Sequence, residues 1–293
     1  MQLLNRGPRV PVLRFSGPIG MATPLRPGLS SGTVAGAIRK AFTMSKTPAV
    51  AIAINSPGGS PVQSSLILKQ VRQQAEEHDK KVYVFCEDVA ASGGYYLAVA
   101  GDEIYADASS IVGSIGVISA SFGFDKAIER LGIERRVYTA GQNKNALDMF
   151  RPEDPDDVAR LKALQRDVHD VFIGVVKDRR AGKLTGPDTE LFSGAFWSGS
   201  KALEYGLIDG ISDMRSKMRE VFGDKVRLVP VPLSRGGFLS RLRKLPSLAA
   251  PGSLRESASF GHGAGDASGI GLALAADLVS ALEVRALWSR YGL

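Results

Sequence analysis

The chain is poor in the residues that build disulfides, metal sites and histidine-dependent active sites. Cys86 is the only cysteine among 293 residues, which excludes an intramolecular disulfide. It stands in the apparent strand "KVYVFCE", where a buried, unreactive thiol is expected. The three histidines, His78, His169 and His262, lie far apart, and all three are expected at the surface. No metal-ligand cluster or phosphate-binding glycine loop is visible, so we expect neither a metal nor another cofactor.

The sequence also lacks a hydrophobic run long enough to cross a membrane. Arg6 and Arg14 interrupt the only stretch that could serve as the apolar core of a signal peptide. The apolar run "IGLALAADLVSALEVRALW" near the C-terminus carries Asp277 and Arg285. The expectation is a cytoplasmic or peripherally membrane-associated protein with no signal peptide and no transmembrane helix.

Charge of one sign is in modest excess, with a net charge of +7 and a pI near 9.5. Much of the excess lies in "SRGGFLSRLRKLP", residues 234–246, and no basic stripe interleaved with aromatic residues is present elsewhere. We therefore expect no nucleic-acid partner. The basic segment 234–246 and the apolar segment 270–293 are the candidates for peripheral contact with a membrane.

What the sequence does contain is a regular alternation of short apolar strands with amphipathic helices, which predicts an α/β layered domain. Ser60 followed by Pro61 reads as the N-cap and first turn of a helix, with Val62, Leu66, Val71 and Ala75 on its inward face. The strands are expected at 9–17, 49–55, 81–86, 103–106, 111–119 and 134–140. The helices are expected at 32–43, from 61 to about 77, 93–100, 125–132, from 155 to about 179, and 198–206.

Three parts of the chain differ in composition. Residues 1–230 have the size and pattern of one catalytic domain. Residues 231–269 are first basic and then rich in Gly, Ser and Ala, which is typical of a linker. Residues 270–293 are predicted to form a C-terminal apolar helix that docks on this domain, on a neighbouring subunit or on a membrane surface.

One serine has the setting that acyl-transfer chemistry requires. In "DVAASGGYYLA", residues 88–98, Ser92 precedes two glycines at the expected start of a helix, where backbone N–H groups are unpaired. In "SPGG", Gly59 stands between a strand end and a helix start. The N–H groups of Gly59 and Gly93 are our candidate oxyanion hole. The pattern alone leaves two alternatives open. Ser92 can serve only to cap or pack a helix, and the glycine pair can serve only to turn the chain.

A histidine base for Ser92 would have to be recruited by a distant contact along the chain, because no histidine lies between Ser92 and residue 168. A lysine can take that role when burial lowers its pKa toward neutrality. Lys144, in the loop "TAGQNKNALDMF", is the candidate, whereas Lys126 reads as a solvated helix residue. A solvent-facing Lys144 remains the alternative.

Six blocks together resemble a known family. "INSPGGS", "DVAASGGYYLA", "IVGSIGVI", "ERLGIE", "AGQNKNALDMF" and "FWSGSKALEYGLIDGI" are similar, in order and approximate spacing, to the signal peptide peptidase A (protease IV) and SohB family of serine peptidases. The similarity spans roughly residues 10–215. It implies a ClpP/crotonase-like layered fold of repeated strand-strand-helix units.

The same resemblance implies a set of site residues. It places a Ser/Lys dyad on Ser92 and Lys144, and the "GSIGV" serine on Ser114, which would orient the lysine amine. It agrees with the oxyanion-hole roles of Gly59 and Gly93. It also implies a homo-oligomer in which the serine of one subunit can meet the lysine of another. The chain departs from the family in lacking both an N-terminal anchor and the duplicated half of the long members.

The resulting hypothesis is a serine endopeptidase that hydrolyses hydrophobic peptides such as cleaved signal peptides. Tyr95 and Tyr96 are candidates for an apolar pocket beside Ser92, and packing in the core is their alternative role. Two other readings stay open: a crotonase-type acyl-CoA enzyme that uses the same glycine turns, and a non-catalytic assembly scaffold.

Overall fold

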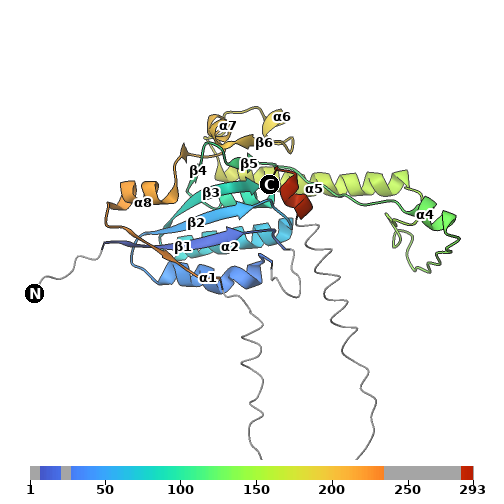
Figure 1. Cartoon of the computed structure of the whole chain (residues 1–293), viewed down its shortest axis with the longest axis horizontal. Coiled ribbons are helices and arrows are strands. Elements are labelled where there is room, and N and C mark those ends of the chain that lie inside the picture. Colours follow the sequence, from blue (N-terminus) through green and yellow to red (C-terminus); the bar gives the residue numbers. More distant parts are fainter. Residues whose placement is uncertain (1–6, 21–27, 234–284, 293) are drawn as a thin grey trace, which may run out of the picture.

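A computed structural model describes residues 7–20, 28–233 and 285–292 of the chain (Figure 1). Residues 234–269 of the predicted linker, the membrane-contact candidate 234–246 and residues 270–284 of the predicted C-terminal helix lie outside this part. The strands are β1 Arg9–Ser16, β2 Ala49–Ser56, β3 Lys81–Ala91, β4 Glu103–Ala106, β5 Ile111–Gly113, β6 Phe196–Ser198, β7 Gly210–Ile211 and β8 Arg227–Pro230. The helices are α1 Ser31–Thr43, α2 Pro61–Glu77, α3 Gly93–Ala98, α4 Asp125–Arg130, α5 Pro155–Arg179, α6 Asp188–Leu191, α7 Gly199–Glu204 and α8 Met214–Phe222.

One mainly parallel sheet organises these elements, in the order β6-β5-β3-β2-β1-β8, with β4 beside β3 and β7 beside β4. All pairs are parallel except β5 with β6. The central strand β2 is buried almost throughout, which explains its continuous apolar sequence "AVAIAINS". The α/β class expected from the sequence is confirmed.

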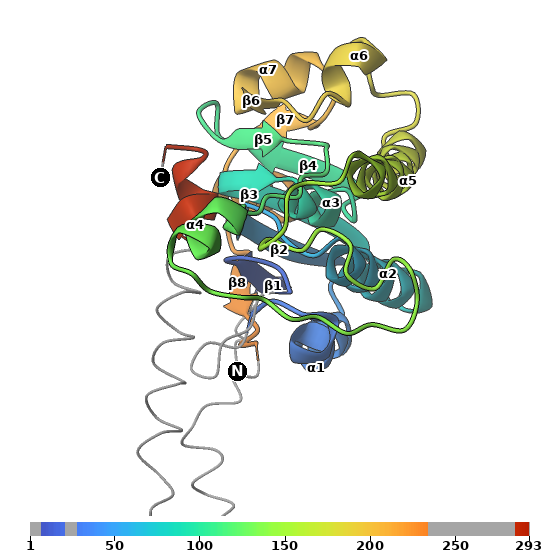
Figure 2. The same ribbon diagram turned by 90° about the vertical axis from the view of Figure 1, so that its right-hand side faces the viewer.

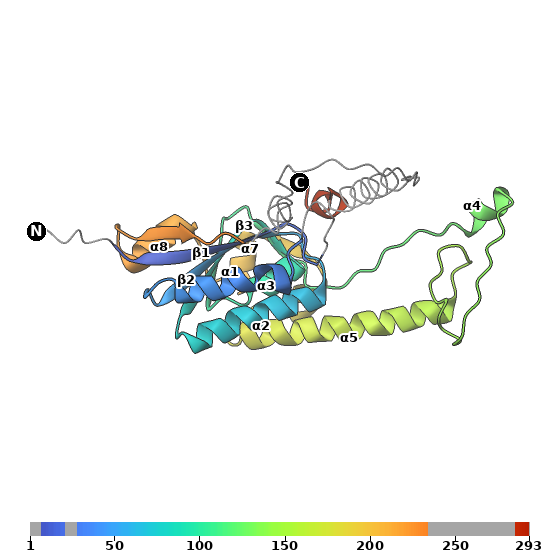
Figure 3. The ribbon, with the colours of Figure 1, turned by 90° about the horizontal axis from the view of Figure 1, so that it is seen from below.

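The side chains of β2 alternate between two apolar layers. Val50, Ile52 and Ile54 point into the larger core, together with residues from α1, α2, α3 and α5. Ala49 and Ala51 point to the opposite face, where Met218 of α8 covers the sheet. Figure 2 shows α1, α2 and α5 together on one side of the sheet, and Figure 3 shows α8 on the other side. Because successive strand residues face opposite sides, one strand supplies both layers.

Helix α2 begins where its cap predicts and turns a different face inward. The Ser60 hydroxyl accepts a hydrogen bond from the Gln63 N–H, and Pro61 opens the helix. Val71 and Ala75 are buried as expected, but Val62 and Leu66 are 65% and 40% exposed, so their inward placement is wrong. Ile67, Leu68 and the small Ser64 take the inward positions in that part of the helix.

Residues 116–154, which we call the arm, leave the body of the domain after β5 and return through the N-terminal half of α5 (Figure 3). The expected strand at 134–140 is wrong: these residues form neither strand nor helix and are exposed throughout. A strand needs a hydrogen-bonding neighbour, and no strand of the described residues pairs with this segment. Helix α4 lies near the outer end of the arm in Figure 3.

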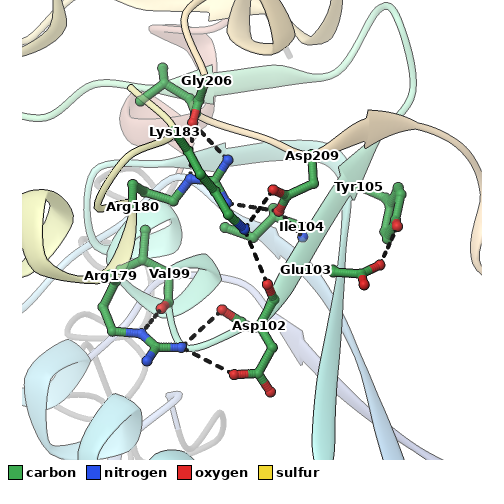
Figure 4. Close-up of polar contacts among 12 residues, drawn as sticks. Val99, Asp102, Glu103, Ile104, Tyr105, Arg179, Arg180, Lys183, Gly206 and Asp209 are labelled. Carbon is green, nitrogen blue, oxygen red and sulfur yellow. Dashed lines mark hydrogen bonds and ion pairs between the residues drawn. The ribbon is translucent and has the colours of Figure 1, made fainter. Parts of the chain in front are cut away.

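The C-terminal end of α5 is anchored to the body by a buried ion pair (Figure 4). Arg180 is 2% exposed, and its guanidinium lies 2.7 Å from the Asp209 carboxylate. Its Nε and Nη2 also donate to the Gly206 carbonyl at 2.9 and 2.7 Å. The Asp209 carboxylate accepts from the Ile104 N–H and from the Lys183 ammonium, both at 2.8 Å. Burial alone raises the pKa of Asp209, but the hydrogen bonds from Arg180 and Lys183 outweigh it and hold that pKa below its usual range.

The described C-terminal residues, 285–292, lie against the body, with residues 285–289 helical. Trp288 and Tyr291 pack on Val89, Ala91 and Ile111. Of the three docking surfaces considered from the sequence, these residues contact this domain. Within the described ranges, no helix has the length and apolar character needed to cross a membrane.

Candidate active site

The candidate residues meet at the carboxyl edge of the parallel sheet. Ala91 at the end of β3 pairs with Gly113 at the end of β5, so Ser92 and Ser114 are the next residues on adjacent strands. Ser56, at the end of β2, pairs with Ala90 of β3, and the "PGG" turn follows directly. The Ser92 N–H donates to the Gly113 carbonyl at 2.8 Å. Ligand sites in open α/β sheets form at this edge, because loops from neighbouring strands converge there.

Ser92 has a conformation that L-amino acids rarely adopt. Its φ and ψ are 53° and −121°, and its side chain makes no capping hydrogen bond to α3. It is half-buried, whereas every other residue from Val89 to Ala100 is buried. The backbone therefore turns sharply between β3 and α3 and leaves this one hydroxyl at the surface of a packed segment. Backbone strain of this kind is concentrated at functional sites.

The glycine turn passes directly across the start of α3. A Cβ added to Gly58 would lie 2.8 Å from the Ser92 Cβ and 2.9 Å from the Gly93 nitrogen. A Cβ added to Gly93 would lie 3.2 Å from the Gly59 nitrogen. Within the described residues, no backbone or side-chain group accepts the N–H of Gly59 or Gly93. The structure thus brings both candidate donors to Ser92 and leaves them available, which fits an oxyanion hole.

Ser114 is 8% exposed and also has a positive φ, of 55°. Its N–H donates to the Ala195 carbonyl at 2.7 Å. The Tyr291 hydroxyl lies 3.5 Å from the Ser114 Oγ and 3.4 Å from the Pro57 carbonyl oxygen. The ring of Tyr291 also meets Phe196 edge-on, with centroids 5.1 Å apart. The C-terminal residues therefore touch both loops that flank Ser92. The apolar character of residues 270–293 is the one sequence feature that points to such a contact.

The structure does not bring Lys144 to Ser92. Lys144 is exposed on the arm, where its N–H donates to the Gly141 carbonyl at 3.2 Å. Local contacts hold this part of the arm: the Phe124 N–H donates to the Met149 carbonyl at 2.6 Å, and the rings of Phe124 and Phe150 pack 5.8 Å apart. Ser92, Gly59, Gly93 and Ser114 thus form one cluster in this chain, and Lys144 lies apart from it.

Tyr95 and Tyr96 do not line an open pocket beside Ser92. They are 0% and 4% exposed and belong to the main core. The Tyr95 hydroxyl donates to the Leu207 carbonyl at 2.8 Å, and Tyr96 packs against Phe172 of α5 with ring centroids 4.9 Å apart. Their alternative role, packing α3 into the core, is the one the structure shows. Cys86 is buried as expected, and burial raises the pKa of its thiol to about 12.

His169 is the residue near this site that the sequence did not single out. Its Nε2 lies 3.0 Å from the carbonyl oxygen of Ile115, the residue after Ser114. The sequence places it on a charged helix and predicts a surface side chain; the structure finds it half-buried. Only the tertiary packing that brings His169 to the residue after Ser114 reveals the contact.

Comparison with known proteins assigns the chain to a family. The profile described as Peptidase family S49 matches residues 74–223, a range that contains Ser92, Ser114 and Lys144. The chain belongs to that family, whose α/β fold its mostly parallel sheet matches.

Three relatives illustrate the range of the similarity. A protein of Brucella abortus (strain 2308) named Na(+)/H(+) antiporter NhaA is 53% identical over 97% of this chain and 37% of its own length. The putative signal peptide peptidase SppA of Enterococcus faecium is 33% identical over 55% of this chain and 46% of its own. Protease 4 of Haemophilus influenzae is 30% identical over 64% of this chain and 30% of its own. The chain therefore spans less than half the length of each of these relatives.

Proposed function

We propose that this chain is a serine endopeptidase in which Ser92 attacks the peptide carbonyl and Lys144 of a second copy is the general base. The observation that carries the proposal is the cluster at the sheet edge. A half-buried Ser92 stands there in a strained turn, beside the N–H groups of Gly59 and Gly93, which pair with no group of the described residues. Membership of a peptidase family supports the reaction class.

In this mechanism the Ser92 hydroxyl gives its proton to neutral Lys144 as its oxygen bonds to the carbonyl carbon. The N–H groups of Gly59 and Gly93 stabilise the negative oxygen of the tetrahedral intermediate. The C–N bond then breaks, and the lysine proton passes to the leaving amine. Water attacks the acyl-enzyme with Lys144 again taking a proton, which releases the acid and restores Ser92. Ser114 holds the lysine amine in line with Ser92.

A base supplied by a neighbouring copy is supported by where Lys144 lies. It is exposed on the arm, which extends away from the body that carries Ser92 (Figure 3). The arm also exposes large apolar side chains, among them Phe122, Leu131 and Tyr138 at 76%, 72% and 91%. Exposed apolar groups gathered on one segment mark an interaction surface. A homo-oligomer would cover this surface and bring Lys144 to the next subunit.

Hydrophobic peptides such as cleaved signal peptides are the proposed substrates. The name of the Enterococcus relative points to the same substrate class. The antiporter activity named for the Brucella relative does not extend to this chain, which matches 37% of that protein.

Two inactive variants test the shared site. Ser92→Ala and Lys144→Ala should each abolish cleavage of a quenched fluorescent peptide. After subunit exchange at equal amounts, about one quarter of the sites would pair an intact serine with an intact lysine, so about a quarter of wild-type activity should return. Lys126→Ala, which removes another exposed lysine of the arm, is the matched control and should stay active.

Three results would refute the proposal. Cleavage by either single variant would remove Ser92 or Lys144 from the mechanism. No recovery after exchange verified by mass spectrometry would refute a site shared between copies. If a fluorophosphonate does not label wild-type protein at Ser92, an acyl-CoA enzyme or a non-catalytic scaffold becomes the better interpretation. Hydrolysis of thioester substrates but not of peptides would then favour the acyl-CoA enzyme.

A further inference from the structure

Only two segments of the chain connect the arm to the body. One is the end of β5 with Ser114 and Ile115, and the other is α5. Ile115 is fully buried in the main core, and a Cβ added to the next residue, Gly116, would lie 2.9 Å from the Gly194 Cα. The outgoing segment is therefore tightly held up to Gly116, immediately after Ser114. The direction in which the arm leaves depends on how these two segments are fixed to each other.

His169 makes a side-chain hydrogen bond between the two segments. Its Nε2 lies 3.0 Å from the Ile115 carbonyl oxygen. A carbonyl oxygen can only accept, so Nε2 carries the hydrogen and donates it. His169 stands one turn before Phe172, which is 5% exposed and packs on Tyr96 of α3. Phe172 is also the first buried residue of α5 in chain order. The bond thus lies where α5, which follows the arm along the chain, reaches the body.

Ser114 is held by hydrogen bonds on both sides of its own residue. Before it, the Gly113 carbonyl accepts from the Ser92 N–H at 2.8 Å; at Ser114, the N–H donates to Ala195 at 2.7 Å. After it, the Ile115 carbonyl accepts from His169. A serine with a φ of 55° keeps that conformation only while its surroundings impose it. Loss of the His169 bond would free the peptide that follows Ser114.

We propose that His169 is a positioning residue for the peptidase site: its hydrogen bond to Ile115 sets the orientation of Ser114 and the direction of the arm that carries Lys144. This inference rests on the proposed function for its effect on catalysis, whereas the restraint on residues 114–118 is independent of that function. His169 touches neither Ser92 nor the substrate, so it acts through Ser114 and Lys144.

The kinetic test compares three replacements of His169 with one control. His169→Gln keeps an N–H donor the same number of bonds from the backbone, His169→Asn carries a donor that falls short, and His169→Leu removes it. His169→Leu and His169→Asn should lower kcat about tenfold, because each removes a contact that positions the catalytic groups. The KM of both variants should stay within about twofold of the wild-type value. His169→Gln should restore most of kcat. His78→Leu, at an exposed histidine beyond α2, should match wild type.

A structural test runs on the same proteins and needs no activity. Amide hydrogen exchange should quicken at residues 114–118 in His169→Leu and His169→Asn, and stay at the wild-type rate in His169→Gln and throughout β2. Equal kcat in Gln and Asn variants would overturn the positioning role, as would unchanged exchange in His169→Leu. If wild type lacks peptidase activity and labelling at Ser92 while the exchange result holds, the proposed function fails and the restraint by His169 stands.

Discussion

Replacing Ser92 by glycine should stabilise the protein relative to replacing it by alanine. The Ser92 backbone, at φ 53° and ψ −121°, lies in a region that costs a non-glycine residue about 1–3 kcal/mol. Glycine avoids that cost and loses about 0.5–1 kcal/mol through the greater freedom of its unfolded chain. The free energy of unfolding of Ser92→Gly should therefore exceed that of Ser92→Ala by about 1 kcal/mol. Both variants lack the hydroxyl, so the comparison isolates the backbone.

Urea unfolding monitored by circular dichroism measures this difference, and equal m-values would show that both variants unfold from comparable states. The matched control is Ala91→Gly, at the preceding residue in β3, where φ is not positive. That change should lower the free energy of unfolding by about 1 kcal/mol, as glycine normally does in a strand. At an unstrained position the glycine variant is less stable than the alanine variant. The sign of the difference in unfolding free energy therefore shows whether the backbone at residue 92 is strained.

A Ser92→Gly protein that is less stable than Ser92→Ala would refute the strained turn. The account of why this hydroxyl stands clear of a buried segment would then fail with it, because the sharp turn is what separates Ser92 from its buried neighbours. The result is independent of turnover, since neither variant carries a nucleophile.

Four further outcomes follow from contacts elsewhere in the chain. Arg180→Met should lower the free energy of unfolding by about 3–5 kcal/mol in urea, because it leaves Asp209 partly buried without its guanidinium. The pKa of Asp209 is held below its usual range, so the stability it contributes is complete above about pH 4 and is lost as pH falls through its folded pKa; the gap in stability between wild type and Asp209→Asn should narrow from pH 5 to pH 3. Burial raises the pKa of Cys86 to about 12, so iodoacetamide at pH 8 should leave the native protein unmodified by mass and alkylate it in urea. Tyr291→Ala should speed trypsin cleavage at Arg290, since Tyr291 packs these C-terminal residues onto the body; an unchanged digestion rate would contradict that docking.

The sequence predicts well those parts of the fold whose partners are close along the chain or whose pattern is repeated. The strand β2 reads as a continuous apolar run because both faces are covered. Ser60 with Pro61 marks the start of α2 through a bond that spans three residues. The turn at Ser92 and its glycines follows from the same local signals. Parallel pairing of β3 with β5 then brings Ser114 to Ser92, which no local signal reports.

The failures have a common cause in contacts that pattern alone cannot assign. Val62 and Leu66 have helical spacing and yet are exposed, since Ile67 and Leu68 occupy the buried side of α2. His169 reads as one polar residue on a charged helix, and its partner is a backbone carbonyl 54 residues away in the chain. Tyr95 and Tyr96 are equally consistent with a pocket and with the core until the helix they belong to is placed under the sheet.

The arm gives the most informative mismatch. Residues 134–140 contain Val137 and Tyr138, residue types that favour a strand, and these two side chains are 41% and 91% exposed. Apolar residues of this kind indicate burial against some surface but do not say in which molecule that surface lies. Apolar patterning that finds no partner among the described residues of one chain, on the same segment as Lys144, is what a site completed by a second copy requires. The mismatch between pattern and structure in the arm thus supports the shared site independently of the geometry around Ser92.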